Sequence, residues 1–135
     1  MVKKIIHITG ENLVKVDDLN KKLDNINLSD PFGMTLSKKK PFFQNLMQDL
    51  TKFHYENSFE YRNFTNILKN FTKCPETLQE IPTLPVQMFK QHDLLSISKN
   101  LVYKTLNSSG TSGQNVSKIY IDATTAKRQS KFLSS

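Results

Sequence analysis

The sequence predicts an α/β chain, and more specifically an α+β arrangement in which helices come first and strands follow. Apolar residues recur at helical spacing between residues 41 and 71. Two short runs rich in β-formers, 101–106 and 117–122, enclose a loop made mostly of glycine, serine and threonine. Pro75, Pro82 and Pro85 exclude a continuous helix between these regions and favour extended chain there.

The N-terminal segment has its own pattern. Residues 2–8 predict a short strand, and residues 17–26 predict a short polar helix. We divide the chain accordingly into a leader, residues 1–35, and a main domain, residues 36–135.

Two amphipathic helices are predicted in the first half of the main domain. The first begins near Pro41, which a first helical turn tolerates, and its apolar stripe runs to Phe53. The second has Asn57 as N-cap with Glu60 three residues later, a capping-box arrangement, and extends to Phe71. We expect the two apolar stripes to pack against each other as a helical hairpin.

The second half predicts mainly extended chain. Residues 86–89 are expected to form a short strand, residues 101–106 the strand that leads into the loop, and residues 117–122 the strand that leaves it. Asp122 or Thr124 is expected to cap a final helix.

The loop between the last two strands has the composition of a phosphate-binding site. Glycine allows positive φ and a close approach to a triphosphate, and successive backbone amides form an anion-binding concavity. Neither the Walker A spacing nor the Gly-x-Gly dinucleotide pattern is present. The same composition is typical of an ordinary hairpin turn, so that alternative stays open here. The candidate cofactor-binding residues are Ser108, Ser109, Gly110, Thr111, Ser112, Gly113 and Lys118.

This loop resembles the phosphate loop of the adenylate-forming ligases, whose usual form is Ser/Thr-Ser-Gly-Thr-Thr/Ser-Gly, a short proline-containing step, and a lysine. The step before Lys118 lacks the proline and is longer than usual. Within that superfamily, the chain from about Leu36 to its end is similar to the LuxE-type acyl-protein synthetases. Besides the loop, the segments that carry this similarity are Phe53–Asn57, Glu60–Arg62, Ile81–Leu94 and Ser117–Asp122.

The resemblance implies an ATP-dependent ligase that activates a carboxylic or fatty acid as an acyl-adenylate and transfers the acyl group to a thiol. It implies ATP and Mg²⁺ as cofactors, with Mg²⁺ held largely by phosphate oxygens, and a reductase or acyl carrier as partner. The adenine motif, the ribose motif and the C-terminal lid of such enzymes do not fit into residues 114–135. We therefore expect an incomplete adenylate-forming domain, the N-terminal portion of the enzyme, that is inactive alone.

The basic composition is also compatible with a binding protein that has no catalytic activity. The net charge is +7, but the lysines are scattered and only Lys38–Lys40 form a run of three. We expect a solvated basic face rather than a nucleic-acid site. The alternative to the ligase is a non-catalytic helical module that binds a partner protein or nucleic acid, and it would tolerate valine at Gly110 and Gly113.

No catalytic residue can be assigned from the sequence. Cys74 is the single cysteine, and in LuxE-type enzymes the acyl-accepting cysteine lies toward the far C-terminus. His54 and His92 are expected to be structural, and no metal-ligand spacing is present. The absence of a leading apolar segment favours the cytoplasm and no membrane span.

Overall fold

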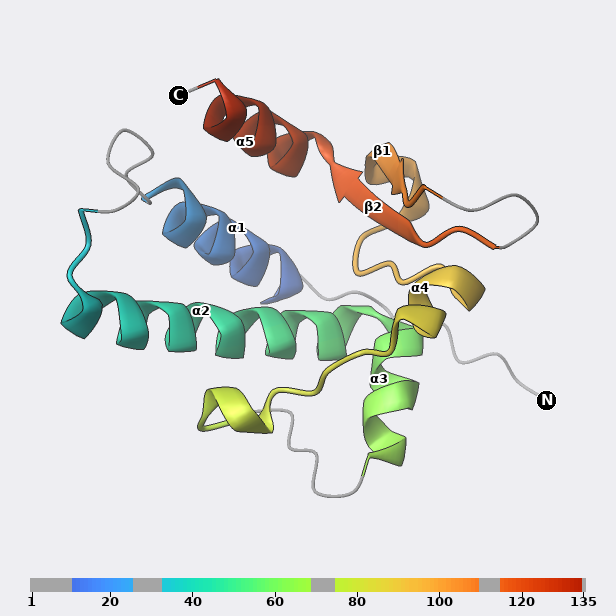
Figure 1. Ribbon diagram of the computed structural model, residues 1–135, viewed down its shortest axis with the longest axis horizontal. Helices are drawn as coiled ribbons and strands as arrows, with labels where there is room; N and C mark the ends of the chain where they lie inside the picture. Colours follow the sequence, from blue (N-terminus) through green and yellow to red (C-terminus); the bar gives the residue numbers. More distant parts are fainter. Residues whose placement is uncertain (1–10, 26–32, 69–74, 110–114, 135) are drawn as a thin grey trace.

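The computed structural model describes residues 11–25, 33–68, 75–109 and 115–134. Helices come first and a small antiparallel sheet follows, so the α+β class is confirmed (Figure 1). The strand expected at residues 2–8 lies outside the described residues. The elements are α1 (Glu11–Asp24), α2 (Leu36–Asn57), α3 (Phe59–Ile67), η1 (Leu78–Glu80), α4 (Val86–Gln91), η2 (Lys99–Leu101), β1 (Val102–Asn107), β2 (Lys118–Asp122) and α5 (Ala123–Leu133).

Helices α1 and α2 lie side by side and run in opposite directions (Figure 1). Leu19 of α1 is buried, and Lys22 of α1 forms an ion pair with Asp49 of α2. Helix α1 begins at Glu11, earlier than the predicted residue 17, because neither glycine nor proline interrupts the segment between them. The helix of the N-terminal segment is therefore packed against the longest helix of the chain.

Helix α2 also begins earlier than predicted. Thr35 is its N-cap residue, and the Thr35 carbonyl accepts hydrogen bonds from the backbone N–H groups of Lys38 and Lys39. Pro41 consequently lies inside the helix rather than in its first turn, where it has no N–H to donate to the carbonyl of Ser37. The helix continues past this position because its later turns bury Leu46 against neighbouring elements.

Helices α2 and α3 form a corner rather than the predicted hairpin. Ser58 alone joins them, whereas antiparallel helices need a loop of about two to five residues. Figure 1 shows α3 pointing away from α2 instead of returning beside it. The two helices still pack at the corner, where the rings of His54 and Tyr61 lie 6.0 Å apart.

The N-cap of α3 is Ser58 and not the predicted Asn57. The Oγ of Ser58 accepts a hydrogen bond from the backbone N–H of Tyr61 at 3.3 Å. Asn57 instead completes α2, where its side-chain amide donates to the Phe53 carbonyl at 2.8 Å. Because Ser58 is only 1% exposed, the cap is made inside the corner.

The segment predicted as a strand at residues 86–89 is the short helix α4. Pro85 precedes it in extended conformation, and the Pro85 carbonyl accepts from the N–H of Met88 at 2.9 Å. A strand needs a neighbouring strand for its backbone groups, and the sheet of the described residues has only β1 and β2. The segment therefore satisfies its backbone locally by closing a helical turn.

The two strands predicted around the loop are confirmed. β1 and β2 pair in antiparallel register, with Leu106 opposite Ile119 and Asn107 opposite Lys118. The register shifts between Val102 and Lys104, so the hairpin carries an irregularity at the end distant from the loop. Two strands alone make a marginal sheet, and helix α5 packs against both of them.

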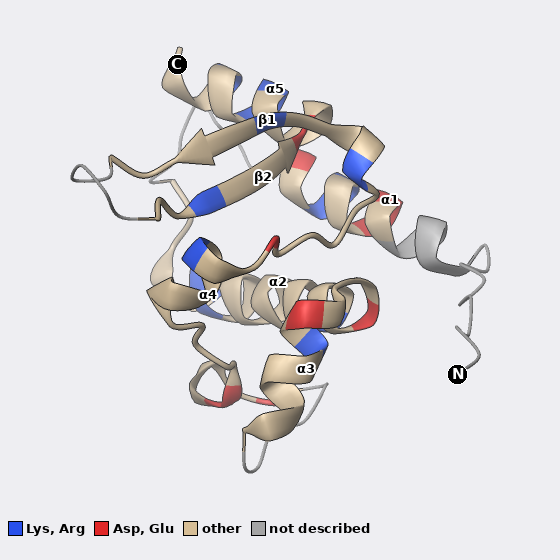
Figure 2. Cartoon of the chain, turned by 90° about the vertical axis from the view of Figure 1, so that its right-hand side faces the viewer, with Lys and Arg blue, Asp and Glu red and all other residues tan. Residues whose placement is uncertain are grey.

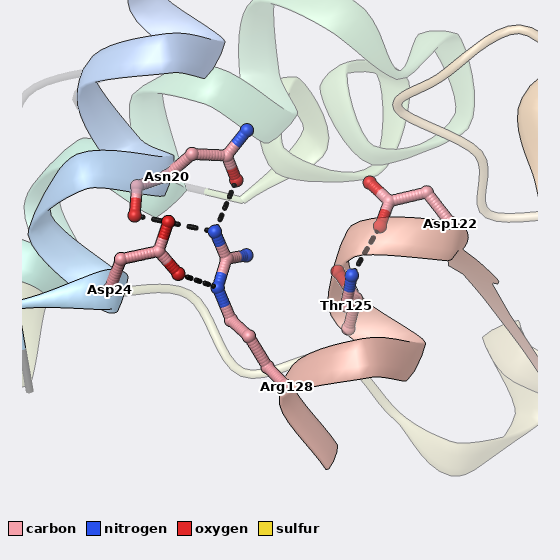
Figure 3. Close-up of polar contacts among 5 residues, drawn as sticks. All are labelled: Asn20, Asp24, Asp122, Thr125 and Arg128. Atoms are coloured by element: carbon pink, nitrogen blue, oxygen red, sulfur yellow. Dashed lines mark hydrogen bonds and ion pairs between the residues drawn. The ribbon is translucent and has the colours of Figure 1, made fainter. Parts of the chain in front are cut away.

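The predicted cap of the final helix is also confirmed. Asp122 Oδ1 accepts from the N–H of Thr125 at 2.6 Å and begins α5 directly after β2 (Figure 3). In Figure 1, α1 lies between α5 and α2. The buried apolar residues of the described chain, Leu19, Leu46, Tyr61 and Ile121, come from α1, α2, α3 and β2.

Candidate phosphate-binding site

The base of the predicted phosphate loop is closed by two hydrogen bonds. The N–H of Ser108 donates to the Ser117 carbonyl at 3.0 Å, and the N–H of Ser117 donates to Ser108 Oγ at 3.0 Å. These bonds extend the strand ladder one step beyond Asn107 and Lys118. The paired strands therefore hold Ser108 and Ser117, the residues on either side of the loop, close together.

The structure describes part of the predicted site. Ser108 and Ser109 lie at the end of β1 and are exposed, and Lys118 is the exposed first residue of β2. The oxygen of Ser108 already accepts from Ser117, so its hydroxyl keeps one hydrogen to donate. The other predicted residues, Gly110, Thr111, Ser112 and Gly113, lie outside the described residues.

Lys118 belongs to a polar cluster whose other members, Asp93, Lys99 and Tyr120, were not among the predicted site residues. The hydroxyl of Tyr120 donates to Asp93 Oδ1, and Lys99 Nζ lies 3.8 Å from Asp93 Oδ2. The Tyr120 hydroxyl and the charges of Lys99 and Lys118 hold the pKa of Asp93 below its ordinary value. We call Asp93, Lys99, Lys118 and Tyr120 the Asp93 cluster. It connects the segment after α4 to the strand that leaves the loop.

The sequence held only a weak signal for this cluster. Asp93 and Tyr120 belong to two of the segments that carry the family resemblance, but they are 27 positions apart. The hydrogen bond between them depends on the tertiary structure, which brings β2 beside the chain around α4 (Figure 1).

Of the two histidines in the described part of the chain, His54 has a structural position, as predicted, whereas His92 is exposed and the structural role of its side chain stays a prediction. His54 Nδ1 lies 2.7 Å from Ser96 Oγ, and its ring contacts Phe53 edge-on with centroids 5.4 Å apart. Burial lowers the pKa of His54, so the neutral imidazole is favoured there. His92 follows α4 and donates its backbone N–H to the Met88 carbonyl. Cys74 lies outside the described residues.

Charge is distributed over the surface rather than gathered at one place. Figure 2 shows lysine and arginine on the strands and on several helices, with acidic residues between them. Across the described ranges, no group of three or more His, Cys, Asp and Glu side chains comes together as a metal site. In the same ranges, no helix has the length and apolar character needed to cross a bilayer.

Comparison with known proteins gives this hairpin a family context. The family model described as "Acyl-protein synthetase, LuxE" matches residues 5–135. The chain belongs to the LuxE family. The match begins upstream of Leu36, so it includes helix α1 together with the helices and strands that follow.

Two curated relatives agree with this LuxE assignment. A "Long-chain-fatty-acid--luciferin-component ligase" from Vibrio harveyi is 31% identical over 106 residues, which is 78% of this chain and 27% of the relative. A ligase of the same name from Aliivibrio fischeri is 28% identical over 99 residues, 73% of this chain and 24% of the relative. The chain thus spans about a quarter of the length of these relatives. No solved structure matched it.

Proposed function

We propose that this LuxE-family chain supplies the triphosphate-binding hairpin of an ATP-dependent acyl-protein synthetase. The enzyme would activate a long-chain fatty acid as acyl-AMP and transfer the acyl group to a thiol, with a reductase or acyl carrier as partner. The observation that supports the proposal is the Ser108–Ser117 closure at the loop end of a paired hairpin, because the sequence between these two serines is rich in glycine and hydroxyl residues. The family match supports an acyl-protein synthetase, and the names of the two relatives support a ligase that acts on a long-chain fatty acid.

In the proposed adenylation reaction, the loop would stabilise the negative charge of the leaving pyrophosphate and would form no covalent bond. A carboxylate oxygen forms a bond to the α-phosphorus of ATP, the bond from that phosphorus to the bridging oxygen breaks, and pyrophosphate leaves with the electron pair. Backbone amides and hydroxyls that bind the β and γ oxygens favour this departure. Lys118, exposed at the start of β2, adds a positive charge at the same end of the hairpin.

The described residues fit ATP better than they fit a protein-held metal ion. The exposed hydroxyls of Ser108 and Ser109 and the charge of Lys118 stand at one end of the hairpin, which suits phosphate oxygens. Mg²⁺ would be held mainly by the phosphates of the nucleotide, since this cation keeps few protein ligands in such sites.

Nucleotide binding by the chain itself tests the proposal. Calorimetric titration with MgATP should give saturable binding that weakens by at least about tenfold, or about 1.4 kcal/mol, in Gly110→Val and Gly113→Val. Gly33→Val is the matched control, because Gly33 is exposed and lies before α2, away from the hairpin. Equal affinity in all four proteins would contradict the proposal and favour the non-catalytic binding module.

A second experiment addresses the reaction. Replacing the matching quarter of the Vibrio harveyi ligase with this chain gives a hybrid of complete length. We expect the hybrid to exchange labelled pyrophosphate into ATP only when a long-chain fatty acid is present, and to lose exchange with Gly113→Val. The 135-residue chain alone should show no exchange. A folded hybrid that exchanges pyrophosphate equally well with valine at this glycine would exclude a role for the loop.

A further inference from the structure

A cavity of about 320 Å³ lies between α1, α2, β2, α5 and the segment that follows α4. Its volume is at the lower end of the range for small-molecule sites in proteins. Leu19 and Ile121, two of the buried apolar residues of the chain, line it from opposite elements. The apolar part of the wall also includes Leu50 and Phe53 of α2 and Leu94 and Ile97 of the segment after α4.

Three polar side chains of the cavity wall, those of His54, Tyr120 and Arg128, are already engaged with protein partners. His54 pairs with Ser96, and Tyr120 donates to Asp93. Arg128 donates to Asn20 and to Asp24 (Figure 3). A ligand inside the cavity would therefore find mainly hydrocarbon surface, which suits an alkyl chain and disfavours a polar molecule that needs buried partners.

The cavity and the phosphate-binding hairpin share strand β2. Tyr120 and Ile121 line the cavity, whereas Lys118 begins the same strand beside the loop. At about 3.3 Å per residue, roughly 10 Å of strand separates Lys118 from Ile121. An extended alkyl chain in the cavity could therefore have its head group near the base of the loop. Lys99 and Lys118 together outweigh the single negative charge of Asp93 beside Tyr120, and the remaining positive charge would attract a carboxylate there.

We infer that this cavity binds the alkyl chain of a linear fatty acid, with the carboxylate emerging beside Tyr120 toward the loop. The inference rests on the proposed function and adds to it the place where the acid lies. It is tested without nucleotide, so that its failure and the failure of MgATP binding are separate results.

The direct experiment uses decanoate below its micelle concentration and the 135-residue chain. We expect saturable binding in an NMR titration, with nuclear Overhauser contacts from the decanoate methylenes to the methyl groups of Leu19 and Ile121. A second groove between α1 and α5, lined by Phe132 and Leu133, offers the competing location. Contacts confined to that groove, or no saturable binding by a folded chain, would overturn the inference.

A cavity-filling variant tests the same inference independently. Leu50→Phe should weaken decanoate binding by about tenfold and weaken hexanoate binding less, since added volume shortens the space left for the chain. Leu36→Phe is the matched control, because Leu36 is 80% exposed and does not line the cavity. Equal weakening in both variants, or in neither, would contradict the assignment. If Leu50→Phe does not fold, the nuclear Overhauser contacts in the unmodified chain decide whether decanoate occupies this cavity.

Discussion

Arg128 of α5 donates from Nε to Asp24 Oδ1 of α1 at 2.7 Å, joining residues 104 positions apart (Figure 3). Its Nη2 also donates to the side-chain oxygen of Asn20 at 3.0 Å. The hydrogen bond from Arg128 is the largest cause of the lowered pKa of Asp24. The first and last described helices are thus connected by a charged hydrogen bond. No sequence pattern within either helix predicts this contact.

This contact should contribute measurably to stability. Replacing Arg128 with Gln should lower the melting temperature by a few degrees, because the Arg128 side chain is only 20% exposed and its guanidinium donates to two residues of α1. Asp24→Asn should lower it less, and the double variant should lose less than the sum. Asp18→Asn is the control, since the Asp18–Lys21 pair is exposed on both sides. Additive losses would show that the two groups act independently.

The corner between α2 and α3 gives a prediction that separates two neighbouring residues. Ser58→Ala should destabilise the chain by about 1 kcal/mol, because it removes the acceptor for the Tyr61 N–H. Asn57→Ala should have less effect, since Asn57 ends α2 and does not cap α3. Chemical denaturation of both variants measures the difference. A larger loss at position 57 would restore the N-cap assignment made from sequence.

Burial of His54 makes stability depend on pH. Its pKa is lowered from 6.5 in the folded chain, so below pH 6.5 the unfolded state binds more protons than the folded state. Stability should therefore fall as the pH drops below about 6.5, by up to about 1.4 kcal/mol per pH unit from this group. His54→Gln keeps a polar partner for Ser96 without titrating. Denaturation at pH 7.5 and 5.5 should show a smaller difference for this variant, and an equal difference would remove His54 as the cause.

The closure of the loop can be measured residue by residue. Ser108→Ala should speed amide hydrogen exchange at Ser117, because its N–H loses the Oγ acceptor. Ser109→Ala should leave that exchange rate unchanged, although both serines belong to the predicted phosphate-binding set. If Ser108→Ala weakens MgATP binding and speeds exchange at Ser117 while Ser109→Ala does neither, the bond that holds the loop ends accompanies nucleotide binding. The reverse order would assign the phosphate contact to Ser109.

Local sequence patterns predicted the structure correctly where the backbone hydrogen bonds of a segment are made within that segment or with a neighbour close in sequence. The two strands around the loop, the Asp122 cap of α5 and the existence of α1, α2, α3 and α5 follow from period, turn chemistry and capping within short windows. The family resemblance was also present in the sequence, because it rests on the order of short motifs. Where the prediction was wrong, at residues 86–89, intrinsic β-propensity had no partner strand to pair with.

The sequence by itself determined the hairpin, its hydroxyl-rich loop and the LuxE kinship, since each depends on residues close together in the chain. Only the tertiary structure decided that α2 and α3 meet at a corner, that Arg128 reaches Asp24, and that Asp93 stands beside Tyr120. The physical reason is that these features depend on contacts between distant segments. Such contacts form only when burial of residues such as Leu19 and Ile121 brings the elements together.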